Sequence, residues 1–170
     1  AVDQKSMTIC TAGIPLALRR LSQAKLRVRI GLSLGSARPE LRKLLMPIEA
    51  RCPLRDSIVA LVEHTKQTQQ SPMLAYTLIR NVNTHPEDAL ALRELALDFG
   101  RLSGRMPRLS LVPYNSRGPD DPFSRATDAE AEQFRLALVE AGFPVVRRYS
   151  GGADIGAACG QLAASTLGSG

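Results

Sequence analysis

The sequence alternates short apolar segments with longer amphipathic ones, and this alternation limits the chain to few folds. Apolar patterning predicts five strands, at residues 6–10, 28–33, 74–79, 109–112 and 145–149. Helical periodicity predicts helices at residues 15–24 and 54–66, and two more follow the capping boxes that Thr84 forms with Glu87 and Thr127 with Glu130. Strands separated by helices favour an α/β fold in which right-handed crossovers build a parallel sheet.

Small and polar residues follow four of the predicted strands. In parallel sheets, functional groups gather just beyond the carboxyl ends of the strands, so these stretches predict one shared rim. They are residues 10–13, 33–36, 81–83 and 113–115. Ser33 can donate a hydrogen bond to a ribose or a carboxylate, or it simply ends its strand. Asn115 can contact an adenine or a ribose, or it opens the next loop as an Asx-turn.

Composition places the chain among globular proteins of a reducing compartment. Its 170 residues, 44% hydrophobic and 22% charged, suit a single domain with a core. No apolar run reaches the roughly 18 residues of a membrane span, and no signal peptide is recognisable. Cys10, Cys52 and Cys159 are too few and too far apart for a disulfide framework or a metal motif, which favours the cytoplasm. Because residue 1 is not methionine, we expect a fragment or a trimmed chain.

The net charge of +6 favours a polyanionic partner such as RNA, which basic surfaces bind by releasing counterions. Much of this charge lies in the first third, at Arg19, Arg20, Lys25, Arg27, Arg29, Arg38, Arg42, Lys43, Arg51 and Arg55. A solvated basic surface without a partner is the alternative. Aromatic residues make up only 4%, so no stacking platform for RNA is visible. His64 and His85 lack partners at metal-ligand spacing, and both are expected on the surface.

Cys159 lies in a bed of small residues, within the segment Asp154-Ile-Gly-Ala-Ala-Cys-Gly-Gln-Leu162. Small neighbours allow another backbone, a cofactor or a nucleobase to approach the sulfur closely. Such a cysteine is either a packed apolar residue or a nucleophile, and its surroundings alone leave both interpretations open. Residues 163–170, which are small and polar, predict a flexible tail.

Other segments accompany the run Ala157-Ala-Cys-Gly-Gln-Leu162 in a recognisable order. They are Thr11-Ala-Gly-Ile14, Ser33-Leu34, residues 42–48 (Arg-x-x-Leu-x-Pro-Ile), residues 76–83 (Tyr-x-x-Ile-x-x-Val-Asn) and residues 111–115 (Leu-Val-Pro-Tyr-Asn). Arranged in this order from residue 6 to residue 162, they resemble the C-terminal half of the RlmN/Cfr family of radical S-adenosylmethionine (SAM) RNA adenine methyltransferases.

This resemblance implies a partial β/α barrel of the radical-SAM type, without its N-terminal strands, over residues 1–162. It implies S-adenosylmethionine as cofactor, contacted by Ser33, Leu34 and Asn115, and a [4Fe–4S] cluster in the parent family. Cys159 would take a methyl group from S-adenosylmethionine and, after radical activation, pass it to C2 of an adenine in 23S ribosomal RNA. In the Cfr branch the target is C8, and RlmN also acts on transfer RNA.

The sequence departs from the family at several positions. It contains no Cys-x-x-x-Cys-x-x-Cys loop, so we expect the chain as given to hold no cluster. Cys10 replaces a serine that contacts the cofactor, Gly35 replaces a histidine, Ala75 replaces a common glutamate and Gly156 replaces an aspartate or serine. The alternative function is therefore a non-catalytic RNA-binding or interaction module of the same fold. An incomplete barrel also exposes a sheet edge, which predicts a homodimer.

Overall fold

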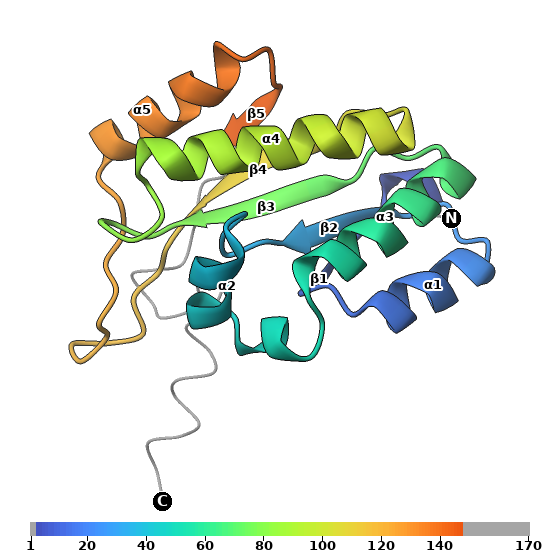
Figure 1. The fold of residues 1–170 in the computed structure, drawn as a ribbon, viewed down its shortest axis with the longest axis horizontal. Helices are drawn as coiled ribbons and strands as arrows, with labels where there is room; N and C mark the ends of the chain where they lie inside the picture. The colour runs from blue at the N-terminus through green and yellow to red at the C-terminus, as the bar shows by residue number, and fades with distance from the viewer. Residues whose placement is uncertain (1–2, 148–170) are drawn as a thin grey trace, which may run out of the picture.

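Five parallel strands form the centre of the structure, a computed structural model that describes residues 3–147 (Figure 1). They are β1 (Thr8–Thr11), β2 (Arg29–Ser33), β3 (Met73–Leu78), β4 (Arg108–Pro113) and β5 (Val145–Arg147). The strands lie side by side in chain order, and each neighbouring pair is parallel. The α/β class expected from the alternation of segments is confirmed.

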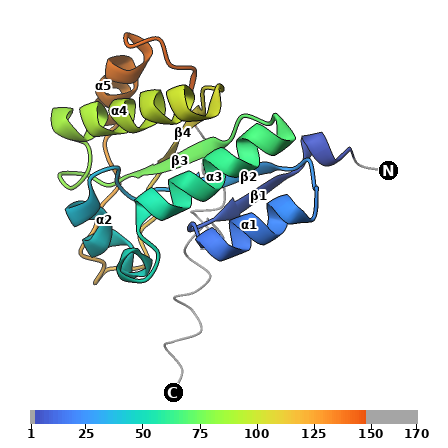
Figure 2. The same cartoon turned by 45° about the vertical axis from the view of Figure 1, so that its right-hand side comes forward.

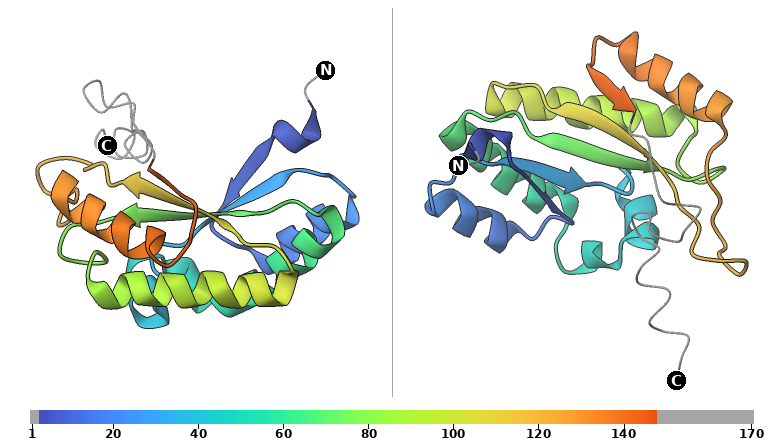
Figure 3. Two further views of the ribbon diagram at one scale, coloured as in Figure 1. Left: turned by 90° about the horizontal axis from the view of Figure 1, so that it is seen from above. Right: turned by 180° about the vertical axis from the view of Figure 1, so that it is seen from behind.

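Within residues 3–147, five α-helices connect the strands, and they cover one face of the sheet (Figures 2 and 3). They are α1 (Pro15–Gln23), α2 (Pro39–Leu45), α3 (Leu54–Thr68), α4 (Pro86–Ser103) and α5 (Asp128–Val139), with short 3₁₀ turns η1 (Gln4–Ser6) and η2 (Pro47–Ala50). None of the helices in this part of the chain combines the length and the apolar character that a membrane span requires.

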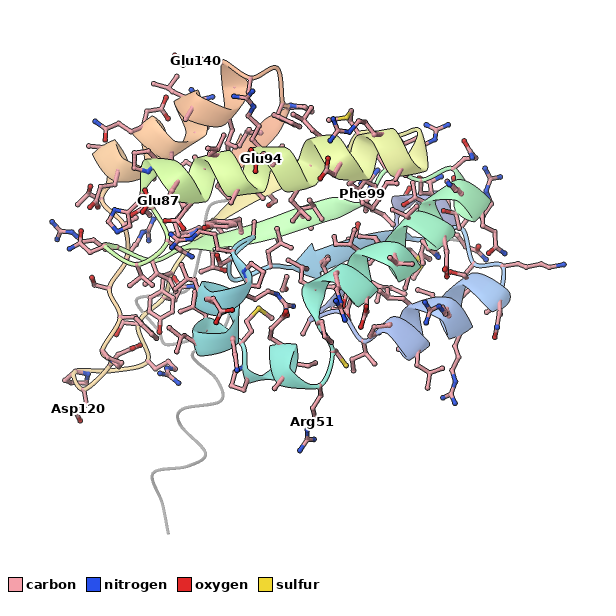
Figure 4. The ribbon with its side chains drawn as sticks, viewed as in Figure 1. Arg51, Glu87, Glu94, Phe99, Asp120 and Glu140 are labelled. Atoms are coloured by element: carbon pink, nitrogen blue, oxygen red, sulfur yellow. The ribbon has the colours of Figure 1, made fainter. Side chains whose placement is uncertain are left out.

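Large apolar residues at every second strand position form the helix-covered face of the sheet. They are Ile30, Leu32, Leu34, Leu74, Tyr76, Leu78, Leu109 and Leu111, all of them buried. Helix α3 contributes Ile58, Leu61 and Val62 to the same core. Phe99 lies between α4 and the sheet (Figure 4). The Tyr76 ring stacks on Phe134 of α5 with 5.2 Å between ring centroids. Burial of this apolar surface is the main source of stability for the fold.

The two predicted capping boxes have different outcomes. Thr127 caps α5 as expected, because its Oγ1 accepts a hydrogen bond from the amide of Glu130 at 3.2 Å. At α4 the prediction is wrong: His85 is the cap residue, and its amide donates to the Asp88 carboxylate at 3.0 Å. Pro86, which favours the first helical position, fixes this start, so Asp88 rather than Glu87 lies three residues after the cap.

The segment between β2 and α3 also differs from the sequence-based expectation. No helix was indicated there, yet α2 and η2 form, each beginning at a proline in its first turn. A helix of seven residues is too short to show a clear apolar period. The last predicted strand is observed at residues 145–147, and its final two residues and the predicted tail at 163–170 lie outside the described residues.

Strand β1 forms one edge of the sheet, since within residues 3–147 it pairs with β2 alone. Most of its residues are exposed. An edge strand with unpaired main-chain groups suits either a larger sheet or pairing between two copies. The homodimer expected from the sequence therefore stays a prediction.

Candidate functional site at the carboxyl edge of the sheet

A cleft of about 360 Å³ lies at the carboxyl ends of β2, β3 and β4. Strand ends, the end of α2 and the loop after β4 supply its lining residues: Ser33, Gly35, Leu45, Met46, Thr77, Ile79, Tyr114, Arg117 and Phe123. Cavities of this volume are typical of small-molecule sites. The shared rim predicted from the sequence is confirmed at these three strand ends.

The strand residues of the cleft belong to the face of the sheet that no helix of residues 3–147 covers (Figure 3). We call it the helix-free face, and its positions on β2, β3 and β4 are Arg29, Gly31, Ser33, Met73, Ala75, Thr77, Arg108, Ser110 and Val112. Ser33 pairs with Ala75, and Thr77 pairs with Val112. Most of these side chains are small, and two of them, Ser33 and Thr77, line the cleft.

Asn83 fixes the ends of β2 and β3 relative to each other. Its Nδ2 donates hydrogen bonds to the carbonyl oxygens of Gly35 and Thr77, each at 2.8 Å, and its Oδ1 accepts one from the amide of Ile79. The Tyr76 hydroxyl donates to the carbonyl oxygen of Asn83 at 2.9 Å. Burial, and then the nearby Asp88 carboxylate, raise the pKa of Tyr76, so the phenol keeps the proton it donates. Asn83, predicted at the rim, thus supports the cleft from behind.

Arg42 joins the ends of β1 and β2 next to the cleft. Its side chain is fully buried, which corrects its assignment to a basic surface. Nε donates to the carbonyl oxygen of Leu34 at 2.9 Å, Nη2 donates to that of Ala12 at 3.0 Å, and Nη1 pairs with the Glu49 carboxylate. Glu49 also accepts a hydrogen bond from the amide of Leu54. These partners offset the cost of burying the charge, and they hold the fourth predicted strand end, at residues 10–13, beside β2.

Gly35 and Met46 form one wall of the cleft together. Gly35 has a φ of +66°, a conformation that favours glycine. A Cβ at this position would lie 2.8 Å from Sδ of Met46. Any side chain at residue 35 would therefore displace Met46, which gives a physical reason for glycine where the family resemblance expects histidine.

The carboxylate of Asp121 organises the loop that forms the opposite wall. Its Oδ2 accepts hydrogen bonds from the Tyr114 hydroxyl at 2.8 Å and the Arg117 amide at 2.7 Å, and its Oδ1 accepts one from the Phe123 amide at 3.1 Å. The Arg117 guanidinium lies 3.6 Å from Oδ2. The Asp121 side chain is only 1% exposed. Hydrogen bonding, first from the Arg117 amide, lowers the pKa of Asp121 to about 2, so the carboxylate stays ionised.

This arrangement presents two aromatic rings to the cleft. Tyr114 and Phe123 pack edge to face with 6.1 Å between ring centroids. Burial, followed by the hydrogen bond and charge of Asp121, raises the pKa of Tyr114. Sequence analysis missed the pair because Phe123 lies in a Pro/Gly-rich loop without periodicity. The low aromatic content also did not indicate that two of the rings lie together at the site.

The predicted cofactor contacts occupy different places. Ser33 lines the cleft. The Leu34 side chain is fully buried on the helix-covered face, and its amide and carbonyl already bond to Ala75 and Arg42. Asn115 directly follows Tyr114 and is 8% exposed. Cys159 lies outside the described residues. The cofactor-binding and catalytic roles of these four residues stay predictions.

The described part of the chain offers no ligand set for a metal or an iron–sulfur cluster. Among residues 3–147, no three His, Cys, Asp or Glu side chains come together in a way that could hold a metal ion. Cys10 and Cys52 are both free thiols. Cys10 lies on the helix-free face, since a Cβ at Gly31 on the neighbouring strand would lie 3.1 Å from its sulfur.

His64 is buried, contrary to the sequence-based expectation, whereas His85 is exposed as predicted. The Nδ1 atom of His64 lies 2.9 Å from the Ser22 hydroxyl, and the Nε2 atom of His64 lies 3.2 Å from the carbonyl oxygen of Val28. The expectation failed because α3 packs against α1 as well as against the sheet, so more than one stripe of the helix is covered. His64 supports this packing and does not line the cleft.

Comparison with solved structures defines the class of the fold. A radical SAM methyltransferase from Sphaerobacter thermophilus matches with a TM-score of 0.83 and 31% identity, over 93% of this chain and 44% of that chain. A domain of the pyruvate-formate lyase-activating enzyme from Bacteroides vulgatus ATCC 8482 shares the fold alone, with a TM-score of 0.57 and 15% identity. The chain therefore has a partial α/β fold of the radical SAM methyltransferase type.

Curated sequences narrow this class. A probable RNA methyltransferase of Sorangium cellulosum (strain So ce56) is 46% identical over 96% of this chain, and a probable dual-specificity RNA methyltransferase RlmN of Acidothermus cellulolyticus is 35% identical over 96%. The chain spans 45% and 37% of their lengths, respectively. No protein-family profile matches the sequence. The resemblance to RlmN-type radical SAM RNA methyltransferases is thereby confirmed along nearly the whole chain.

Proposed function

We propose that this chain is part of a radical SAM RNA methyltransferase and that its cleft binds S-adenosylmethionine. The observation that carries the proposal is the cleft at the carboxyl ends of three strands, in a chain 46% identical to a probable RNA methyltransferase. The cleft combines the hydroxyls of Ser33 and Thr77 with two aromatic rings and the apolar wall around Met46. Such a mixture suits a ligand that has a purine, a ribose and a flexible chain with a sulfonium centre.

Cys159 is proposed to receive a methyl group from S-adenosylmethionine, as the resemblance implies. When bound, S-adenosylmethionine supplies a methyl group attached to positively charged sulfur. The Cys159 thiol would first lose its proton to solvent, because the thiolate is the nucleophile. Its sulfur would then bond to the methyl carbon as the bond between that carbon and the sulfonium breaks, which would leave S-adenosylhomocysteine.

The residues described between 3 and 147 support binding and positioning rather than radical generation. A [4Fe–4S] cluster requires three or four thiolate ligands, and this part of the chain contributes the separate thiols Cys10 and Cys52. The radical step implied by the resemblance would need cluster ligands other than these. The described residues provide a cleft between Met46 and the aromatic pair, with the hydroxyls of Ser33 and Thr77 in its lining. Asn83 supports the strand ends behind it.

The proposed substrate is an adenine of RNA, methylated at C2 in 23S ribosomal RNA, with C8 and transfer RNA as alternatives. Exposed cationic side chains near the cleft support an RNA partner. Lys43 lies on α2, whose last residue lines the cleft, and Arg117 lines the cleft with its side chain 56% exposed. Contacts from such groups to phosphates release counterions. Ribosomal or transfer RNA as substrate places the protein in the cytoplasm.

Incubation of the purified protein with S-adenosylmethionine that carries a labelled methyl group tests this function. We expect binding, followed by one labelled methyl group on Cys159, located by mass spectrometry of its peptides. Cys159→Ala should bind the cofactor and remain unlabelled, while Cys52→Ala, the matched control, should label as the wild type does. Binding without label on Cys159 contradicts the carrier role, and absence of binding contradicts the proposed function.

Affinity for S-adenosylmethionine separates this proposal from a non-catalytic RNA-binding module, which the exposed cations favour. Both predict that RNA affinity falls steeply as salt concentration rises. A module predicts RNA binding with no affinity for S-adenosylmethionine. An affinity for RNA that does not change with salt would contradict both.

A further inference from the structure

Ser110 lies on the helix-free face, and its hydroxyl has no hydrogen-bond partner among residues 3–147. It stands in β4 between Leu109 and Leu111, which point into the core, so the alternation of strand side chains turns it to the opposite face. Ser110 is 1% exposed, and its Oγ makes no hydrogen bond within the part of the chain that the structure describes. Buried hydroxyls are normally hydrogen-bonded, so an unpartnered one requires a specific explanation.

The neighbours of Ser110 connect it to the cleft. Ser110 pairs with Ala75 of β3, and Ala75 pairs on its other side with Ser33 of β2, which lines the cleft. Adjacent strands are about 4.8 Å apart, so Ser33 and Ser110 lie about 10 Å apart across Ala75. Thr77, another cleft residue, stands two positions beyond Ala75 on the same face. Because Ala75 carries only a methyl group, β3 puts nothing large between the two serines.

Two other buried polar atoms lack partners among the described residues, and neither is placed in this way. Thr65 Oγ1 belongs to α3, on the other side of the sheet. Arg29 Nε belongs to the first residue of β2, at the end of the strand opposite to the cleft. Ser110 is thus the unpartnered group that stands one strand away from cleft residues and faces the same way.

We propose that the cofactor site extends from the cleft across Ala75 and that the Ser110 hydroxyl donates a hydrogen bond to S-adenosylmethionine. This inference rests on the proposed function. The ligand supplies the partner that residues 3–147 do not, which accounts for a polar atom that would otherwise destabilise the strand. Ser33, Thr77 and Ser110 then form a hydroxyl-bearing floor around Ala75, and Ser110 is a binding residue that contacts the cofactor.

The Ser110→Ala variant tests this role, because it removes the hydroxyl and changes little else. Calorimetric titration should give a Kd for S-adenosylmethionine about 3- to 10-fold higher than that of the wild type, the loss expected for one hydrogen bond. The melting temperature without ligand should be unchanged or higher, since a buried unpartnered group has been removed. If Ser110 had only a structural role, the variant would melt at a lower temperature and keep the wild-type Kd.

Ser103→Ala is the matched control. Ser103 is also a buried serine, but its hydroxyl donates to the carbonyl oxygen of Arg105 at 2.9 Å and accepts from the Arg105 amide at 3.1 Å. This variant should melt at a lower temperature and keep the wild-type Kd. Ala75→Leu adds a second variant: its larger side chain fills the space between Ser33 and Ser110 and should raise the Kd further than Ser110→Ala.

Each outcome decides something different. A wild-type Kd in Ser110→Ala, with a raised melting temperature, overturns the role of Ser110 and leaves the cofactor site itself intact. A wild-type Kd in Ala75→Leu overturns the extension of the site across β3. If the wild-type protein does not bind S-adenosylmethionine, the proposed function fails, and this inference fails with it.

Discussion

The two faces of the sheet use the same strands for opposite purposes. In β3, Leu74, Tyr76 and Leu78 point into the core, while Ala75 and Thr77 alternate with them on the helix-free face. Large side chains on one face fill the space below the helices, whereas the other face carries small or hydroxyl-bearing side chains, among them Thr77 of the cleft. In β3, the even positions therefore contribute to the core, and the odd positions face the proposed binding site.

This division differs from the pattern of a parallel sheet that is buried on both faces. Strands covered on both sides are typically continuous runs of Val, Ile and Leu. Here, Gly31, Ser33, Ala75 and Ser110 interrupt the runs at every second position. The alternation indicates that large side chains pack one face against the helices, and the proposed cofactor would occupy the other.

The largest effect is expected at Arg42, which ties the strand ends from the helix-covered side. Arg42→Ala leaves the Glu49 carboxylate without its guanidinium and removes the donor from the carbonyl oxygens of Ala12 and Leu34. Because a buried charge loses its partner, we expect the free energy of unfolding to fall by about 3–5 kcal/mol. Urea denaturation followed by circular dichroism measures it. Arg51→Ala, at an exposed position, should change it by less than about 0.5 kcal/mol; similar losses in both would refute the buried tie.

Two neighbouring residues of β4 test whether the two faces contribute differently to stability. Leu111 is fully buried below the helices, whereas Val112 lies on the helix-free face and is partly exposed. Leu111→Ala should cost about 3 kcal/mol of unfolding free energy, because it leaves a cavity in the core. Val112→Ala should cost no more than about 1 kcal/mol. Equal losses in chemical denaturation would show that packing stabilises both faces, which would contradict this difference between them.

The helix-covered face could be predicted from the sequence, because burial against helices imposes a regular period on the apolar residues. The helix predicted at residues 54–66 is an example, since it is observed as α3, and the Thr127 cap of α5 is another. Both predictions rest on residues that lie close together in the chain. This local consistency explains why the α/β class and the parallel sheet were predictable.

The helix-free face could be predicted only in part from the sequence. Ser33 was identified because it ends a strand, but Thr77 and Ser110 carry no periodic signal and gain meaning from their neighbours in the sheet. Arg42 and His64 were misplaced for a related reason: their partners lie up to 42 residues away in sequence, as with Ser22 and His64. Contacts of this kind cannot be inferred from a single sequence without the register of the strands.

The smallest expected effect concerns the loop wall of the cleft and appears only on acidification. In the folded protein the pKa of Asp121 is about 2, against about 3.9 for an unperturbed aspartate. The unfolded chain therefore binds more protons between these values, and the stabilisation from Asp121 is complete above about pH 4 and lost as the pH falls through about 2. Asp121→Asn should be less stable than the wild type at neutral pH, because the ionised acceptor is gone.

The difference in melting temperature between wild type and Asp121→Asn should then shrink as the pH approaches about 2. Asp120→Asn is the matched control, since the same change is made one residue away at the exposed tip of the loop (Figure 4). The melting temperature of Asp120→Asn should equal that of the wild type at every pH. A gap between Asp121→Asn and wild type that stays constant from neutral to acidic pH would mean that packing, and not the ionised carboxylate, holds Tyr114 and Phe123 against the cleft. In that case the loop wall would resemble the helix-covered face in how it is stabilised.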